Sequence, residues 1–176
     1  MKEVLASGNG AKAAARSGQP SLKGRALRLL SMREHSRAEL ARKLAPFAMP
    51  DDDLESMLAG LVAQGWISDE RVAHSHVNRR AARLGVARVR QELLAKGVSS
   101  EVVSAAVEEL QASELARAAN VWQKKFGIAP ADARERARQG RFLLGRGFGA
   151  STVNAVLARA ADILLGEWPP SSDWNG

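Results

Sequence analysis

RVRQELLAKGV at residues 88–98 and FLLGRGF at residues 142–148 end alike: a leucine-rich helical pattern is followed by a cation, a glycine and an apolar residue. A glycine just past a helix adopts the left-handed conformation without a Cβ clash, and a cation before it lies at the negative helix end. The residue after the glycine then packs on the last turn of the helix. These stretches therefore predict equivalent helix ends at Gly97 and Gly147. The expected contacts are Val98 with Leu93 and Phe148 with Leu143.

The apolar residues around these helix ends recur along the chain. A shift of 49 residues places Leu40, Leu44, Met49, Leu54, Leu58 and Leu61 on Val89, Leu93, Val98, Val103, Val107 and Leu110. A further shift of 50 residues places Leu93, Lys96, Gly97, Val98, Val103 and Val107 on Leu143, Arg146, Gly147, Phe148, Val153 and Leu157. Chance agreement is an alternative in a chain rich in leucine, valine and alanine. The matching turns favour one supersecondary unit used three times.

Each unit is predicted to contain three helices. The expected helices span residues 22–33, 37–46, 52–64, 69–83, 86–96, 100–111, 113–126, 132–146 and 150–165. The predicted organisation is a disordered tail (1–20), three three-helix repeats (21–67, 68–111 and 112–165) and a C-terminal tail (166–176). One unit alone is too small to bury its apolar stripes, so neighbouring units must stack. We therefore expect an all-α fold in which three tandem three-helix repeats form an elongated curved array.

Local signals support several of these helix boundaries. Ser36-Arg-Ala-Glu39 has the form of a capping box, in which serine and glutamate satisfy free backbone amides at a helix start. Ser68 can cap the first helix of the next repeat. The first repeat has Ala48, with Pro46 before it, where the other two have glycine. Its middle helix must therefore end in a different turn.

Composition limits the chemistry available to the chain. Its 176 residues include no cysteine, so a disulfide, a thiolate nucleophile and a cysteine-ligated zinc are excluded. The sequence shows neither an apolar run of membrane-spanning length nor a signal-peptide pattern. These features predict a soluble cytoplasmic protein with no membrane association.

No motif predicts a catalytic, cofactor or metal site. His74 and His76 point in different directions on a helix, and neither they nor His35 have the companions that a metal site needs. Residues 51–53, three aspartates, suit a helix N-terminus better than a calcium loop. Residues 145–150 fit the dinucleotide pattern G-x-G-x-x-A, but helical sequence rather than a strand precedes them. We expect a binding protein rather than an enzyme.

Basic residues are the strongest chemical signal. The formal net charge is +7 and the sequence pI is about 10.5, which favours nucleic acid or a nucleoprotein as partner. Arginine forks suit phosphates and carboxylates. A solvated helix face is the alternative for each residue, and Lys96 and Arg146 can simply be helix-capping cations. The candidate contact surface consists of Arg79, Arg80, Arg83, Arg88, Arg90, Lys96, Arg141 and Arg146.

Part of the first repeat is similar to a winged-helix DNA reader. Residues 37–44 would be its second helix, residues 54–64 its recognition helix, and residues 65–67 the entry to the wing. A wing requires a β-hairpin, whereas residues 68–76 read as a capped helix start. The wing is therefore missing, although an autonomous DNA-binding protein or transcription factor stays as an alternative function.

Four motifs together resemble the RecX family of regulators of the recombinase RecA. They lie in order at residues 33–44, 65–73, 88–98 and 142–148, within a resemblance covering about residues 22–165. The most specific is Gly65-Trp-Ile-Ser-Asp-Glu-Arg-Val-Ala73. The chain departs from the family pattern at three places. Val72 and His76 stand at positions that are often aromatic, and Gly85-Val86 replaces a common Gly-Pro pair.

The resemblance implies three tandem three-helix repeats that bind RecA filaments on single-stranded DNA. Family members lodge in the groove of the filament, restrain its growth and lower ATP hydrolysis, strand exchange and coprotease activity. This implies a role in homologous recombination, DNA repair and the SOS response, without enzymatic activity or a cofactor. We expect a monomer that reaches single-stranded DNA through the filament, with weak direct DNA binding left open. The missing catalytic constellation argues against the remaining alternative, an enzyme acting on nucleic acid.

Overall fold

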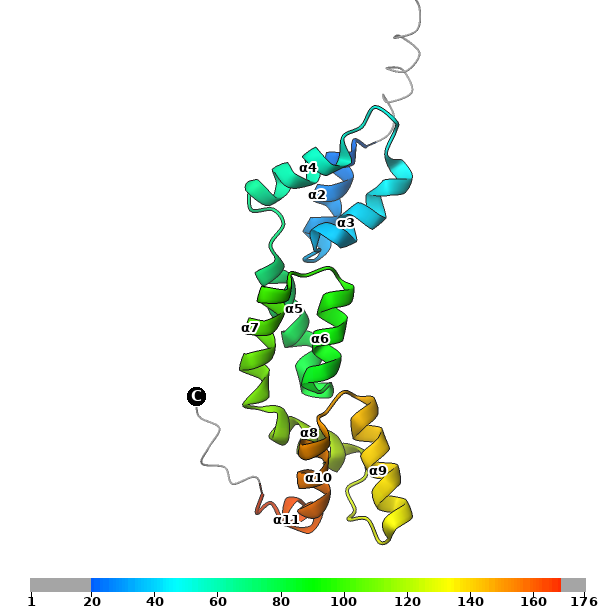
Figure 1. Ribbon diagram of the computed structural model, residues 1–176, viewed down its shortest axis with the longest axis vertical. Helices are drawn as coiled ribbons and strands as arrows, with labels where there is room; N and C mark the ends of the chain where they lie inside the picture. The colour runs from blue at the N-terminus through cyan, green and yellow to red at the C-terminus, as the bar shows by residue number, and fades with distance from the viewer. Residues whose placement is uncertain (1–19, 169–176) are drawn as a thin grey trace, which may run out of the picture. The chain divides into compact units, whose positions relative to one another are not determined.

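A computed structural model describes residues 20–168, and all regular structure in that range is helical. The chain divides into two compact units, the first ending at Ser68 and the second beginning at Asp69 (Figure 1). Of the two predicted tails, residues 1–19 and 169–176 lie outside the described part. None of the described helices combines the length and apolarity needed to cross a membrane.

The first unit contains one three-helix repeat. Its helices are α2 (Leu22–Met32), α3 (Arg37–Leu44) and α4 (Leu54–Ala63), with a 3₁₀ turn, η1 (Ala45–Phe47), after α3. Helix α3 packs against both α2 and α4. The core consists of Ala26, Leu40, Leu44, Leu58, Leu61 and Ile67, all of them buried. These residues recur three and four positions apart within α3 and α4, which gives each helix one apolar face.

The boundaries of α3 confirm two sequence expectations. The Glu39 backbone N–H donates to Ser36 Oγ at 3.1 Å, and the Ser36 N–H donates to Glu39 Oε2 at 3.3 Å. The capping box is therefore complete. At the other end, Pro46 lies inside η1 and Ala48 is extended. The middle helix of this repeat thus ends without a left-handed glycine, as its sequence predicts.

The second unit begins with the second repeat. Helix α5 (Asp69–Arg80) is followed by a 3₁₀ turn, η2 (Ala81–Arg83), and then by α6 (Val86–Ala95) and α7 (Ser100–Gln111). The prediction of one helix over 69–83 is therefore wrong for its last three residues. The Ala81 carbonyl at the start of this turn accepts from the Arg117 guanidinium of the third repeat at 2.7 Å, a contact that the local sequence does not contain. Val72 and His76 are both buried, so α5 packs normally despite its departures from the family pattern.

The third repeat completes this unit. It contains α8 (Glu114–Lys125), α9 (Ala133–Gly145), α10 (Ala150–Ala158) and α11 (Ala160–Leu165). A single helix over 150–165 is wrong, because the chain breaks at Arg159, where φ is −110° and ψ is 25°. Local propensity favours a continuous helix, but tertiary packing overrides it. The break turns α11 onto α8, and Ile163 joins the core around the buried Trp122.

The two predicted glycine helix ends are present. Gly97 has φ 76° and Gly147 has φ 83°. The Val98 N–H donates to the Leu93 carbonyl at 3.3 Å, and the Phe148 N–H donates to the Leu143 carbonyl at 3.3 Å. Each glycine N–H donates to the residue three positions earlier, which completes the expected motif at the ends of α6 and α9.

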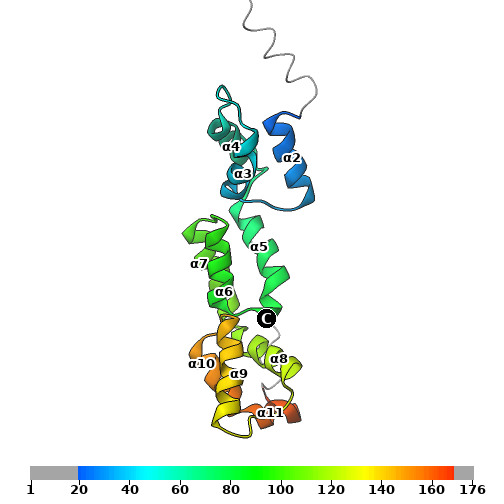
Figure 2. The ribbon, with the colours of Figure 1, turned by 90° about the vertical axis from the view of Figure 1, so that its right-hand side faces the viewer.

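The second and third repeats meet where α9 ends and α6 begins. Both views show α6 and α9 following one another along this unit (Figures 1 and 2). The Gly85 N–H donates to the Arg146 carbonyl at 2.9 Å, and the Ala87 N–H donates to the Gly147 carbonyl at 3.2 Å. The C-terminal carbonyls of one helix thus satisfy the free N-terminal amides of the other. Backbone hydrogen bonds fix how these two repeats are spaced.

Candidate partner-binding surface

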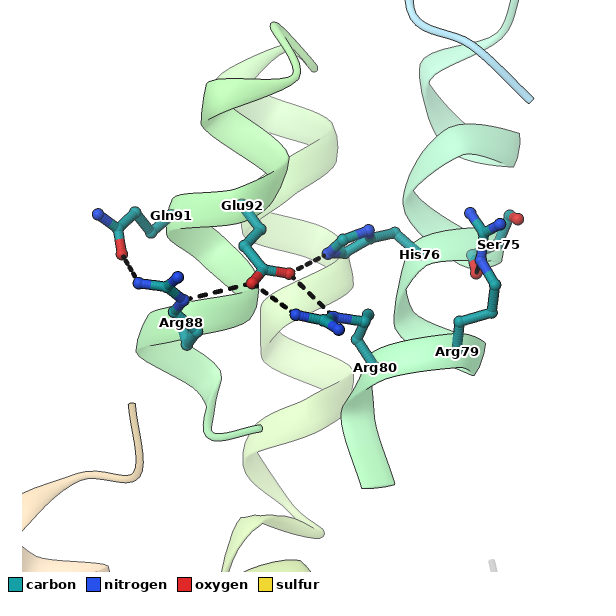
Figure 3. Close-up of polar contacts among 7 residues, drawn as sticks. All are labelled: Ser75, His76, Arg79, Arg80, Arg88, Gln91 and Glu92. Carbon is teal, nitrogen blue, oxygen red and sulfur yellow. Dashed lines mark hydrogen bonds and ion pairs between the residues drawn. The ribbon is translucent and has the colours of Figure 1, made fainter. Parts of the chain in front are cut away.

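An ionic network centred on Glu92 links α5 to α6 in the second repeat (Figure 3). Its carboxylate lies 2.9 Å from His76 Nε2 and 3.0 Å from Arg80 Nη2. Arg88 reaches the same carboxylate from one turn earlier on α6, with Nε 3.3 Å from Oε1. One partly buried carboxylate therefore holds two of the predicted surface arginines in fixed positions.

The network determines the charge of its members. Burial lowers the pKa of His76, although the hydrogen bond and charge of Glu92 act in the opposite direction. For Glu92, burial acts to raise the pKa, but the hydrogen bonds and charges of Arg80 and His76 outweigh it and the pKa is lowered. The hydrogen bond to Glu92 raises the pKa of Arg80. At neutral pH the network is therefore an anionic carboxylate between two cationic guanidinium groups, with His76 mostly neutral.

The third repeat holds cations by a different means. Fifty residues after His76 and Glu92 stand Phe126 and Phe142, whose rings pack edge to face with centroids 5.1 Å apart. The Arg146 guanidinium lies 3.8 Å from the Phe142 ring centroid. An aromatic ring attracts a cation through its quadrupole but carries no net charge. The third repeat therefore orders its cation without neutralising it.

Two residues of α8 fasten the second and third repeats together. Glu114 accepts from the Val86 N–H at 2.7 Å and from Thr152 Oγ1 at 3.0 Å. The half-buried Arg117 donates to backbone carbonyls of the second repeat, including that of Leu110 at 3.0 Å. Burial lowers the pKa of Arg117, but an arginine stays protonated at physiological pH. Arg117 is thus a structural cation of the joint.

The structure separates the predicted surface residues into three groups. Arg80 and Arg88 share Glu92, and Arg88 also adjoins the end of α9, since a Cβ on Gly147 would lie 2.5 Å from its backbone nitrogen. Lys96 and Arg146 are half-buried at the ends of α6 and α9. The remaining residues are exposed and form no ion pair with any residue between 20 and 168. They are Arg79, Arg83, Arg90 and Arg141.

Two of these exposed arginines differ in setting from their neighbours. Arg90 follows Arg88 by two positions, which places it about 200° around α6 and away from the Glu92 network. Arg79 donates through Nε to the Ser75 carbonyl at 3.1 Å, so its side chain folds back along α5. The basic stretch of sequence therefore forms more than one face of the second repeat.

The residues that organise this surface are not evident from the local sequence. There, Glu92 is only an acid among arginines, and His76 is only a histidine without metal-binding companions. The repeat register contains a signal for them, because both shift by 50 residues onto phenylalanines that contact each other. Glu114 and Arg117 carry no such signal, since each also contacts another repeat. Within residues 20–168 the structure brings together no cluster of three or more potential metal ligands.

The fold and this surface define a class of all-helical proteins built from tandem three-helix repeats with an arginine-rich exterior. Three family models, those of the first, second and third three-helix domains of RecX, match residues 23–59, 68–107 and 112–157. The chain belongs to the RecX family. The resemblance drawn from the four motifs and the prediction of three tandem three-helix repeats are both confirmed.

Individual relatives agree with this assignment. Regulatory protein RecX of Leptothrix cholodnii is 54% identical over 82% of this chain and 91% of its own length. That of Neisseria meningitidis is 38% identical over 82% of this chain and 94% of its own. The crystal structure of RecX from Lactobacillus salivarius has the same fold, with a TM-score of 0.67 over 80% of this chain and 94% of that one at 19% identity. The names of these relatives support a regulatory role for the chain.

Proposed function

We propose that this chain is a non-enzymatic regulator that binds RecA filaments on single-stranded DNA. It lies in the groove of the filament and lowers ATP hydrolysis, strand exchange and coprotease activity. It acts by binding alone, as a monomer, and it needs no cofactor. Family membership supports the choice of partner.

The observation that carries the proposal is the fixed joint between α6 and α9. Backbone hydrogen bonds hold the two repeats end to end, so their exposed arginines keep a constant spacing. A filament presents the same surface on each successive subunit. A rigid pair of similar repeats is suited to such a target. It makes several contacts at once, whereas only one molecule loses translational and rotational entropy on binding.

The exposed arginines without ion pairs are the contact residues we assign first. Arg90 and Arg141 have no acidic partner within residues 20–168, so binding a phosphate or carboxylate does not require an existing ion pair to break. Arg80 and Arg88 are already partly neutralised by Glu92. Their role is to present a preorganised positive edge rather than to release Glu92 on binding.

The deciding experiment measures the single-stranded-DNA-dependent ATPase of RecA while this protein is titrated at sub-stoichiometric ratios. We expect strong inhibition, and its stoichiometry distinguishes end effects from full occupancy of the groove. The double variant Arg90→Glu and Arg141→Glu should need about 10-fold more protein for half inhibition. The matched control, Lys23→Glu with Lys124→Glu, changes net charge equally at exposed positions outside α6 and α9 and should inhibit normally.

Two results would contradict the proposal. Unchanged ATPase at saturating protein, together with tight sequence-selective binding to duplex DNA, would instead identify an autonomous DNA-binding protein. Cleavage of labelled DNA in Mg²⁺ and nucleotide, without RecA, would identify an enzyme. Equal inhibition by both double variants would leave RecA as the partner but remove Arg90 and Arg141 from the contact.

A further inference from the structure

The first unit carries a groove of about 310 Å³ between α2 and the end of α3. Its residues come from two short segments, one that runs from Pro20 into α2 and one on α3 with η1. They are Pro20, Arg25, Arg28, Leu29, Met32, Lys43, Leu44 and Phe47. None of the predicted surface residues lies here, so this site stands on separate observations and does not rest on the proposed function.

Large apolar side chains line the groove and remain open to solvent. Met32 is 76% exposed and Phe47 is 50% exposed, whereas Leu44 beneath them is 1% exposed. Met49, two residues after Phe47, is 54% exposed. Isolated exposed apolar residues are ordinary, but Met32 and Phe47 line one concavity, which favours a binding site. Methionine also adapts its shape to different apolar partners.

The polar part of the groove is entirely cationic. Arg25, Arg28 and Lys43 line it, and no carboxylate does. Within residues 20–168, Arg28 and Lys43 form no ion pair. An apolar floor with a positive rim is complementary to a ligand that has an apolar side and negative flanks.

We propose that this groove binds an acidic amphipathic helix of a partner protein. The apolar side chains of that helix, spaced three and four residues apart, fill the space above Leu29 and Leu44. Its carboxylates meet Arg28 and Lys43. An amphipathic helix thus lies with its apolar face in the groove, and the charges of the groove's rim set the orientation of that helix.

The groove is less suited to two other occupants. Single-stranded nucleic acid needs open aromatic faces for its bases to stack on. The only aromatic ring of the groove, Phe47, has the Arg25 guanidinium 4.2 Å from its centroid, and the other apolar residues are aliphatic or proline. The chain's own residues 1–19 contain Lys2, Lys12 and Arg16 against one acid, so they carry the same sign of charge as the rim.

The test uses the full chain and a fluorescein-labelled designed peptide, an amphipathic helix about four turns long with leucines on one side and glutamates on its flanks. Fluorescence anisotropy should show saturable binding. The double variant Arg28→Glu and Lys43→Glu should weaken it about 10-fold or more. Lys23→Glu lies on the same helix, is exposed and is not part of the groove, so it should change binding by less than about 2-fold. Circular dichroism shows whether each variant keeps its helical content.

Peptide variants separate charge from apolar contact. Replacing the glutamates by glutamine, or the leucines by serine, should each abolish most of the binding. Met32→Ser, at an exposed position, should weaken binding without affecting folding. Equal binding of the glutamine peptide, or a loss with Lys23→Glu as large as that with the double variant Arg28→Glu and Lys43→Glu, would overturn the proposal. Displacement of the peptide by an oligo-dT strand would assign the groove to nucleic acid and would also overturn it.

Discussion

The second and third repeats place different chemistry at the same two positions of one backbone frame. Between the first and middle helices, the second repeat has His76 hydrogen-bonded to Glu92. The third has Phe126 and Phe142 in an edge-to-face contact. Both pairs tie the same two helices together, and both gather arginines around them. These two repeats therefore share a side-chain pair at this place, which is polar in the second repeat and aromatic in the third.

The difference matters for how each repeat responds to solution conditions and presents its charge. The ion pairs of Glu92 with Arg80 and Arg88 depend on salt, whereas an aromatic contact does not to a comparable degree. Glu92 also cancels part of the charge of Arg80 and Arg88, while Phe142 leaves the charge of Arg146 intact. We infer that the third repeat supplies the stronger positive potential. The potential of the second repeat changes more with salt and pH.

The joint between these repeats should give the largest effect of any small substitution. In Gly147→Ala, the new Cβ would lie 2.5 Å from the Arg88 backbone nitrogen at a φ of +83°. Because backbone atoms cannot move aside as a flexible side chain can, we expect the free energy of unfolding to fall by about 4 kcal/mol. Urea denaturation followed by circular dichroism measures it.

Gly166→Ala is the matched control for that substitution. Gly166 also ends a helix, with φ +76°, but a Cβ added there would meet no atom within 4 Å. Gly166→Ala should therefore lower the free energy of unfolding by only about 1 kcal/mol, which is the cost of holding alanine in the left-handed conformation. Equal losses at the two glycines would show that conformation rather than contact between the repeats is the cause, and that the α6–α9 joint is loose.

Removing one member of each pair should show how much the Glu92 network and the phenylalanine contact each contribute to the free energy of unfolding, and how that contribution depends on salt. Phe142→Ala removes a partly buried ring and should cost about 2–3 kcal/mol of unfolding free energy, nearly independent of salt. Glu92→Ala leaves His76 without its partner and should cost about 1–2 kcal/mol. In 1 M NaCl the loss from Glu92→Ala should shrink, because screening already weakens the ion pairs in the parent protein. A salt-independent loss for both would mean that the Glu92 network contributes through packing alone.

The sequence predicts those features of the fold that depend on residues close together in the chain, and it misses those that depend on distant residues. The helix ends at Gly97 and Gly147 and the capping box at Ser36 are local, and all are confirmed. The break at Arg159 does not follow from the sequence, because packing of α11 on α8 causes it and nothing in the local sequence opposes a helix. The 3₁₀ turn after α5 escapes prediction for a similar reason, since the residue that holds it is Arg117 on α8.

For the candidate surface, the sequence predicts which residues are basic but not which of them are available. The spacing of Arg88 four residues before Glu92 allows an ion pair that Arg90 cannot make, but the Arg80 and His76 contacts of Glu92 come from α5 and are not evident in the sequence. Arg146 is predictable as a helix-end cation, but its position over Phe142 depends on the geometry of that turn. Assigning Arg90 and Arg141 as contact residues stays a prediction for the filament assay.

The smallest expected effect is a pH dependence specific to the second repeat. The pKa of His76 is lowered from 6.5 in the folded protein by burial, so the unfolded chain binds its proton first as the pH falls. Stability should therefore be fully present above about pH 6.5 and decline as the pH drops below it. Between about pH 6.5 and 5 this decline belongs to His76 rather than to Glu92, since Glu92 has a pKa lowered from 4.5 and stays ionised. Urea denaturation at a series of pH values measures the slope.

His76→Gln tests this assignment, because glutamine can donate to Glu92 but does not titrate in this range. Its stability should decline less steeply than that of the parent protein over the same pH range. His74→Gln, at an exposed position two residues earlier on α5, should keep the parental decline. The third repeat has phenylalanines at the equivalent positions, so hydrogen exchange should locate the pH-dependent loss of protection in α5 and α6 and leave α8 and α9 unchanged. Loss of protection spread equally over both repeats would instead mean that the joint through Gly85 and Gly147 makes them open as one cooperative body.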